Sequence, residues 1–493
     1  MALAGLPLPR FVVFESKTAN SNCGRYLRYI AEQGELNDVV SCDGYNATIP
    51  NAKFEVEQPR NLAVMDKPVV HIRSCYNNKY LRAEQHRWIV AAADEPNEDQ
   101  CQWSCTLFEP VFSRHHPNLI RLLHVQSRLY LHCDGVNESV LMVDDAKAVN
   151  DENAGGLFQV VNWESLIILP KHVAFKGDNG LFLGVSKIEG FSDPLLQFGV
   201  ADEREDRSVR NQIVSRPDGL SIQIKNTCSG SFWKRDDCNW ICPLADAYPE
   251  NGSLDATFKV IKIKDNTIAL LNLGNNHFCK RYTVGKATSC LRAMDPTVTE
   301  FAHLEVTDIV VASRSIYNIQ FRLWHARIIH ENKTKLTSRI MATAVVINNT
   351  TEPKKKVLKL TFDDTNNSTW KNSSSLRLVG SPKVRIESDV VHIRDSEIEV
   401  SSSELGTSYA WNETTTQTVS VTRIHKVVVS PMTKVTVRLI ATIGTCEVPF
   451  SYVQHDILYT GEDETYVQDD GLYTRTNAYN FVYETSEDPL DSR

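Results

Sequence analysis

The chain has 493 residues, which is enough for about three domains of ordinary size. A formal net charge of −8 and a hydrophobic fraction of 42% are ordinary for a globular protein, and they disfavour a domain that mainly binds nucleic-acid phosphates. No run approaches the roughly 18 consecutive apolar residues of a transmembrane helix, so we expect any membrane contact to involve β-strands.

The N-terminus reads MALAGLPLPRF and lacks both a basic segment and a long apolar segment. This pattern predicts no secretory signal peptide, and therefore a cytoplasmic or nucleocytoplasmic location. In a reducing compartment we expect the twelve cysteines to be mostly free thiols. The pairs Cys101/Cys105 and Cys238/Cys242 have no histidine partners at zinc-like spacing, so we predict no metal site.

Short strand-like runs separated by turn residues fill the chain, and long helical periodicity is nearly absent, which predicts an all-β protein. Within the first 310 residues one pattern occurs twice. An aromatic residue precedes a Trp-Ile pair by eight positions, as Tyr80 before Trp88 and again as Phe232 before Trp240. The two copies are offset by 152 residues, about the length of one domain.

A finer repeat lies inside each copy. The runs GRYLRY (24–29), NKYLRA (78–83) and RLYLHC (128–133) recur at intervals of about 50 residues, which is the pattern of a β-trefoil. We predict one β-trefoil over residues 1–162 and a second over 163–310. Aromatic residues of the predicted strands, such as Phe108 and Phe258, are expected to be core. Trp88 and Trp240 either belong to the core or frame a sugar.

Several segments carry a family resemblance over nearly all of residues 7–310. VHIRSCYNNKYLR, WIVAAADEPNEDQCQWSCTLFEP, FKGDNGLFLGV and NHFCKRYTVGK resemble the agglutinin domain of amaranthin-like plant lectins. The resemblance implies two β-trefoils and a head-to-tail dimer, with the sugar held between the first domain of one subunit and the second domain of the other. It also implies a ligand of the galactose/N-acetylgalactosamine class, notably Gal-β1,3-GalNAc.

By this resemblance the sugar-contacting loop runs from Arg82 to Trp88 and is about one residue shorter than in the family. Gln85 stands where an Asn-like amide is expected, and Arg87 where an aromatic is expected. Polar groups would bind the sugar hydroxyls, and an apolar ring would cover the C–H face. The alternative is a solvated hairpin tip. The predicted carbohydrate-binding residues are Arg82, Gln85, His86, Arg87 and Trp88 in the first copy and Asp236, Asn239 and Trp240 in the second.

Residues 311–493 have a different composition, with one cysteine, Cys446, and dense Ser and Thr from about residue 331. The runs SYAWNETTT, VVVSPMTKVTV and CEVPFSYVQHD resemble the aerolysin-like module of β-pore-forming toxins. The resemblance implies an elongated antiparallel β domain and a hairpin that refolds into a membrane barrel built by a ring of subunits.

We place the inserting hairpin at residues 376–400, with a charged tip at 387–397 and Pro382 interrupting its first arm. In the second arm Val391 and Ile393 share one phase, whereas Ile398 and Val400 follow in the opposite phase. The alternative is a soluble hairpin that packs on the body of the module.

The common catalytic motifs HExxH, GxSxG, the P-loop and GxGxxG are absent from the sequence, so we predict no enzyme, no catalytic residues and no cofactor. Three hypotheses remain: a defence lectin of the plant type that targets a pore-forming module, a lectin whose last module only mediates assembly or stress signalling, and a protein-interaction scaffold. The predicted partners are galactose/N-acetylgalactosamine glycans, further copies of the chain (a dimer in solution, a ring on membranes) and a membrane surface, but no nucleic acid.

Overall fold

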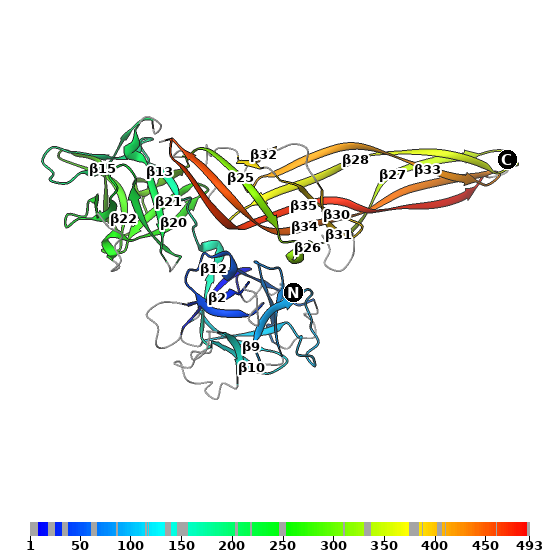
Figure 1. Ribbon diagram of the computed structural model, residues 1–493, viewed down its shortest axis with the longest axis horizontal. Helices are drawn as coiled ribbons and strands as arrows, with labels where there is room; N and C mark the ends of the chain where they lie inside the picture. The colour runs from blue at the N-terminus through cyan, green and yellow to red at the C-terminus, as the bar shows by residue number, and fades with distance from the viewer. Residues whose placement is uncertain are drawn as a thin grey trace. The chain divides into compact units, whose positions relative to one another are not determined.

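The computed structural model describes residues 8–17, 25–31, 38–60, 67–84, 87–113, 116, 118–133, 140–144, 156–202, 206–216, 219–245, 253–308, 311–329, 337–373, 384–386, 388–401, 407–409, 411–459 and 461–490. These residues form β-strands, turns and short 3-10 helices, with no α-helix among them. The chain divides into two compact units, the first holding residues up to Ser313 and the second most residues from Arg314 onward. The predicted all-β class is confirmed: two β-trefoils precede an elongated domain whose strands pair antiparallel except for β25 and β29, which pair in parallel (Figure 1).

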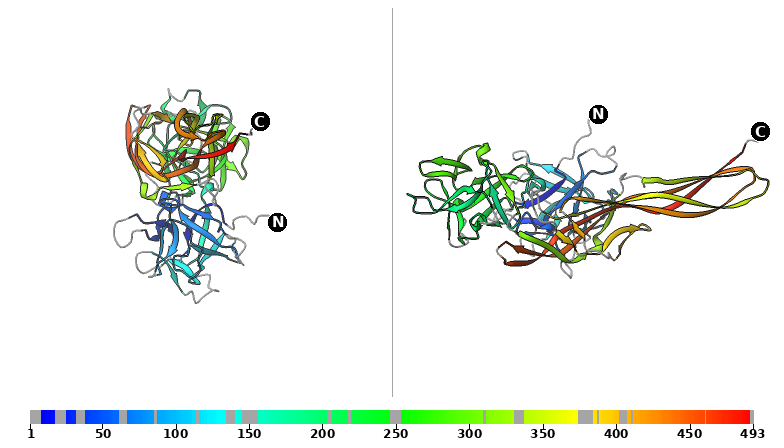
Figure 2. Two further views of the ribbon diagram at one scale, coloured as in Figure 1. Left: turned by 90° about the vertical axis from the view of Figure 1, so that its right-hand side faces the viewer. Right: turned by 90° about the horizontal axis from the view of Figure 1, so that it is seen from above.

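The first β-trefoil has twelve strands in one sheet, and its blue-to-cyan strands gather into one rounded body in Figure 2. Its centre is aromatic, with the fully buried rings of Phe14, Phe54 and Phe158 in contact. Alternating strand residues point into this core, which is why aromatics recur at the repeat spacing. The elements are β1 (Phe11–Ser16), β2 (Arg25–Tyr29), β3 (Val40–Gly44), η1 (Pro50–Ala52), β4 (Phe54–Glu57), β5 (Val70–Ser74), β6 (Tyr80–Ala83), β7 (Ile89–Ala93), β8 (Leu107–Phe112), β9 (Leu119–His124), β10 (Leu129–Cys133), β11 (Leu141–Asp144) and β12 (Phe158–Asn162).

The second β-trefoil repeats this plan with twelve further strands. Its central ring is Trp233, which is fully buried and contacts Phe175 and Phe258. The elements are η3 (Trp163–Ser165), β13 (His172–Lys176), β14 (Phe182–Ser186), β15 (Leu195–Val200), η4 (Arg207–Val209), β16 (Asn211–Ser215), β17 (Ser221–Asn226), β18 (Phe232–Arg235), β19 (Ile241–Ala245), η5 (Leu254–Ala256), β20 (Phe258–Lys264), β21 (Thr267–Asn272), β22 (His277–Val284), β23 (Ala287–Asp295), η6 (Glu300–Ala302) and β24 (Leu304–Thr307).

A disulfide joins Cys42 on β3 to Cys133 on β10 within the first β-trefoil. Nine further cysteines in the described part of the chain form no disulfide. The sequence did not single out the Cys42–Cys133 pair, because its two members lie 91 residues apart in different repeats.

The last domain consists of long strands. Its main sheet has the order β32-β29-β25-β34-β35-β28-β33, with β26 and β27 also paired to β34. Strands β28 and β33 pair over sixteen consecutive positions, from Lys354 opposite Val429 to Thr369 opposite Thr414, and we call this pair the ribbon. The elements are β25 (Val311–Phe321), η7 (Leu323–His325), β26 (Arg327–Ile329), β27 (Thr337–Asn348), β28 (Lys354–Lys371), β29 (Val384–Ile386), β30 (Val390–Arg394), β31 (Glu397–Ser401), β32 (Thr407–Tyr409), β33 (Thr414–Val429), β34 (Thr433–Leu458) and β35 (Asp463–Pro489).

Two apolar clusters hold this domain together. One surrounds Trp370, whose ring contacts Phe450 and Tyr473. The other lies beneath the ribbon, where Leu360 and Phe362 pack against residues of β34. One face of the ribbon is therefore already buried, and the other faces solvent.

Two buried histidines of the first β-trefoil, His71 and His124, predict a stability that depends on pH. The Nδ1 atom of His71 lies 3.1 Å from the Thr106 carbonyl oxygen, and the Nε2 atom of His124 lies 2.9 Å from the Cys105 carbonyl oxygen. Burial lowers the pKa of both imidazoles. As the pH falls below about 6.5 the unfolded chain therefore takes up these protons before the folded chain does.

We expect the free energy of unfolding to be insensitive to these two groups above about pH 6.5, and to fall below it by up to about 1.4 kcal/mol per pH unit for each histidine. Urea unfolding across that range measures the slope, which His124→Gln should reduce. The matched control is His116→Gln, because His116 is exposed. An unchanged slope in His124→Gln contradicts the assignment.

Candidate functional site

The two predicted sugar loops share backbone features at the residues that the structure describes. In the first, which we call the first tip (residues 84–88), the Glu84 N–H donates to the Trp88 carbonyl at 2.8 Å. In the second tip (residues 236–240), the Asp236 N–H donates to the Trp240 carbonyl at 2.9 Å. Arg87 and Asn239 both have φ of 69°, a left-handed conformation at the same position of each turn. The 152-residue offset seen in the sequence therefore holds for this hydrogen bond and for the φ angle at this position.

Side chains at the first tip present charge beside an aromatic ring. The Arg82 guanidinium binds the Glu84 carboxylate at 2.6 Å, and Arg87 is exposed. Trp88 is half-buried against a small cluster that includes Val90 and Val140. Two other predicted residues of this loop, Gln85 and His86, lie outside the described residues.

The polar side chains at the second tip hold the turn itself. Asp236 Oδ1 accepts the Trp240 N–H at 2.7 Å, and burial raises the pKa of this carboxyl above its usual value. Asn239 Oδ1 accepts from Arg235 Nη1 at 2.7 Å and from Asn275 Nδ2 at 3.1 Å. Each therefore makes hydrogen bonds that stabilise the loop conformation.

Trp240 is only 4% exposed, so its ring lies in a satellite core and offers no open face. Of the two alternatives for Trp240, a core residue fits the structure better than a ring that frames a sugar. Its ring meets the edge of Phe191 at 6.1 Å and lies 6.3 Å from Tyr282. The Arg292 guanidinium lies over both rings, 4.9 Å from Trp240 and 5.3 Å from Tyr282.

The outward-facing groups beside the second tip are therefore Phe191, Tyr282 and Arg292. Phe191 is 36% exposed, and the other two are half-buried. The sequence did not identify them because they lie some 40 to 50 residues from the tip, in the other two repeats. The threefold repeat of the sequence could have pointed to these residues, because residues of different repeats meet at the tip. Trp240 and Arg292, which belong to two different repeats, form a direct β-bridge.

An aromatic surface next to a guanidinium is suited to a sugar. The ring covers the C–H face of a pyranose, and the guanidinium donates to vicinal hydroxyl groups. The Arg292 Nε–H donates to the Cys238 carbonyl at 3.1 Å, and this hydrogen bond fixes the direction of the side chain. In the described part of the chain, no group of three or more His, Cys, Asp or Glu side chains is placed to hold a metal ion.

The predicted inserting hairpin has a different form from the one expected. Strands β30 and β31 form a separate two-stranded hairpin whose tip is Asp395-Ser396, and Pro382 and residues 374–383 lie outside the described residues. The observed turn lies inside the charged stretch 387–397 that was expected at the tip, but this stretch also contains β30 and the start of β31, and part of the expected arm over 376–400 lies outside the described residues. Asp395 and Ser396 both have positive φ, the geometry of a two-residue hairpin turn.

The true register explains the phase change in the sequence. Val391 lies opposite Val400 and Ile393 lies opposite Ile398, so all four apolar side chains share one face. The charged residues Arg394, Glu397 and Glu399, with His392, occupy the other face. The hairpin is amphipathic along its whole length. The change of phase in the sequence arises because the turn lies between its two strands.

This hairpin packs on the body of its domain. Val391 and Ile393 are buried in the cluster around Trp370. The Asn477 side chain binds the Ile393 backbone twice: Oδ1 accepts the N–H at 3.0 Å and Nδ2 donates to the carbonyl at 2.8 Å. Gly444 leaves room for the docked side chain, because a Cβ there would lie 3.1 Å from Ile393 Cδ1. No helix in the described part of the chain is long and apolar enough to cross a membrane.

Comparison with known proteins identifies one domain family. The agglutinin domain model matches residues 7–162 and again residues 167–310. No curated protein sequence matches the chain.

Several solved structures share distant similarity. Lamprey immune protein has a TM-score of 0.33 and 10% identity, covering 65% of this chain and 100% of that one. A mosquitocidal holotoxin has a TM-score of 0.28 and 13% identity, covering 66% and 37% of the two chains. Parasporin-2 of Bacillus thuringiensis, a toxin that recognizes cancer cells, has a TM-score of 0.19 and 20% identity, covering 36% and 74%. At these scores the likenesses carry no functional meaning.

Proposed function

Because the chain belongs to the family of agglutinin-domain proteins, we propose that it is a lectin for galactose/N-acetylgalactosamine-type glycans. Its last domain then assembles on the glycosylated membrane and forms a β-barrel pore, as in a defence protein of the plant type. The sugar half of the proposal rests on two tips that share a backbone hydrogen bond and a left-handed residue, each placed beside an aromatic ring and an arginine.

A glycan array tests the sugar half. We expect Arg292→Ala to weaken binding to galactose-type glycans by roughly 10-fold to 100-fold, because a hydrogen bond from a charged donor contributes about 1.5–3 kcal/mol. The matched control is Arg281→Ala on the same β22–β23 hairpin. Arg281 lies opposite Leu291, whereas Arg292 lies opposite Lys280, so the two arginines point to opposite faces.

Arg281 binds Asp178 through two hydrogen bonds, at 2.7 and 2.5 Å, and its loss should leave sugar affinity unchanged. Equal losses of sugar affinity in Arg292→Ala and Arg281→Ala would mean that the sugar binds at another place on the protein. No binding of the unmutated protein to any galactose-type glycan refutes the lectin proposal as a whole and favours the scaffold alternative.

One observation supports the pore half: an amphipathic hairpin lies in the segment that connects the two paired strands of the ribbon. A membrane-crossing β-strand needs about 9–11 residues, whereas β30 and β31 have five each. The 42 residues between β28 and β33 are enough for two arms of that length. We propose that this whole segment straightens, continuing the ribbon, and that a ring of subunits closes the barrel.

Release of a trapped dye from liposomes that carry a galactose-terminated glycolipid tests the pore half. Release that requires the glycolipid is the expected result. Sugar binding without release supports the alternative, in which the last domain mediates assembly or stress signalling and forms no pore.

A further inference from the structure

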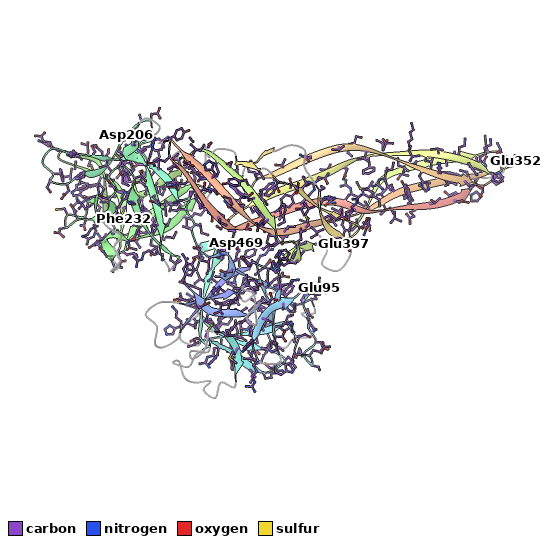
Figure 3. The ribbon with its side chains drawn as sticks, in the orientation of Figure 1. Glu95, Asp206, Phe232, Glu352, Glu397 and Asp469 are labelled. Carbon is purple, nitrogen blue, oxygen red and sulfur yellow. A yellow bond between two sulfur atoms is a disulfide. The ribbon has the colours of Figure 1, made fainter. Side chains whose placement is uncertain are left out.

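The solvent-facing side of the ribbon alternates lysines with β-branched apolar residues near the end where Lys354 lies opposite Val429. In three successive cross-strand pairs, Lys355 lies opposite Val428, Val357 opposite Lys426, and Lys359 opposite Ile424. All six side chains are exposed, the three apolar ones to between 54% and 62%. We call these six residues the basic face. It lies along the part of β28 and β33 that runs toward Glu352, which Figure 3 labels.

The basic face contains no carboxylate. Among the residues that the structure describes, none pairs with Lys355, Lys359 or Lys426 in an ion pair. The next positions on the same side are hydroxyl residues, which bind one another across the strands: Thr361 to Thr422 at 2.9 Å and Thr365 to Thr418 at 3.1 Å. The first acidic residue on this side is Asp363, beyond the first of those pairs.

Folding alone accounts for part of this pattern. β-branched residues favour strands, and lysines on an edge strand such as β33 discourage unwanted strand pairing. Neither effect explains why carboxylates are absent, since the chain has 61 acidic residues against 53 basic ones. Nor does core packing explain Val357 and Ile424, because the ribbon buries its other face through Leu360 and Phe362.

We infer that the basic face is a docking surface for a membrane rich in anionic lipid headgroups. The three ammonium groups bind headgroup phosphate and carboxylate oxygens, while Val357, Ile424 and Val428 enter the interface between the headgroups. Nucleic acid fits less well, because single strands bind through bases stacked on aromatic rings and this face has no aromatic residue. The inference goes beyond the proposed function, since this contact needs neither a sugar nor a pore.

Co-sedimentation of the full chain with vesicles that lack glycolipid tests the inference. We expect binding to phosphatidylcholine vesicles containing phosphatidylserine, little binding to phosphatidylcholine alone, and release at high salt. The double variant Lys355→Gln/Lys359→Gln should bind roughly 25-fold more weakly, because each lysine near an anionic surface contributes a factor of about five. Val357→Thr/Ile424→Thr keeps the β-branched shape and should also weaken binding.

The matched control is Lys354→Gln/Lys356→Gln, which removes the same charge from the same strand. Side chains alternate along a strand, so these two lysines point to the opposite face. We expect this control to bind within about twofold of the unmutated protein, on the ground that it leaves the basic face intact.

Equal losses in the two lysine variants would mean a non-specific charge effect and overturn the inference. So would unchanged binding in both, or equally tight binding of a single-stranded oligonucleotide with the same loss in Lys355→Gln/Lys359→Gln. Vesicle binding without dye release supports this inference while contradicting the pore proposal, so the two can fail separately.

Discussion

Replacing Val400 with lysine is expected to abolish dye release while leaving the folded protein and its sugar binding intact. Val400 is 40% exposed in the docked hairpin, so a lysine there meets water. In the proposed barrel the same face turns toward lipid, where a lysine costs about 2–4 kcal/mol near the bilayer midplane. This cost lowers the equilibrium constant for insertion of each subunit by a factor of roughly 30 to several hundred, and it applies to every subunit of the ring.

Glu397→Lys is the control for this result. Glu397 is exposed on the same hairpin but belongs to the charged face, which would line the water-filled interior of a barrel. It introduces the same side chain directly after the hairpin tip and should retain release. Thermal unfolding and a glycan array confirm that both variants are folded. If Val400→Lys still releases dye at the original rate, this hairpin does not enter the lipid.

Replacing Trp233 with alanine should destabilise the second β-trefoil by about 3–5 kcal/mol, the range for a buried aromatic replaced by alanine. Trp233 fills the centre of the barrel between Phe175 and Phe258. Its Nε1 atom also donates to Asn211 Oδ1 at 3.2 Å, a hydrogen bond that alanine cannot replace. In differential scanning calorimetry we expect the transition of this domain to fall by roughly 10 °C.

Trp103→Ala provides the comparison, because Trp103 lies in the first β-trefoil and is 40% exposed. Its effect should stay within about 0.5 kcal/mol, as for most surface substitutions. A similar loss of stability in both variants would mean that Trp233 does not hold the barrel core.

The two β-trefoils could be predicted from the sequence because a closed barrel imposes its spacing on the chain. Aromatics such as Phe108 and Phe258 recur where a strand enters the core, and the structure places both at full burial. The offset between Trp88 and Trp240 in the sequence locates both tips. Local periodicity contains this information, so one sequence was enough.

The side chains around the tips could not be predicted in the same way. Arg292 and Tyr282 reach Trp240 from another repeat, and only the closed barrel brings them together. The turn of the hairpin could not be located for a related reason. Its turn is fixed by positive φ at Asp395 and Ser396, and neither is a glycine that would mark such a turn in the sequence.

Side-chain contacts hold the hairpin of β30 and β31 in its docked position. Within the described residues β30 and β31 pair only with each other. The two hydrogen bonds of the Asn477 side chain, a third from Asn480 Nδ2 to Ser396 Oγ at 2.7 Å, and the burial of Val391 and Ile393 hold them in place. Together these contacts amount to a free energy of the order of 5 kcal/mol. About one molecule in several thousand would then have the hairpin undocked at any moment. With so few molecules undocked, the apolar face of the hairpin stays buried in almost all of them. The undocked molecules are still numerous enough for a membrane to bind.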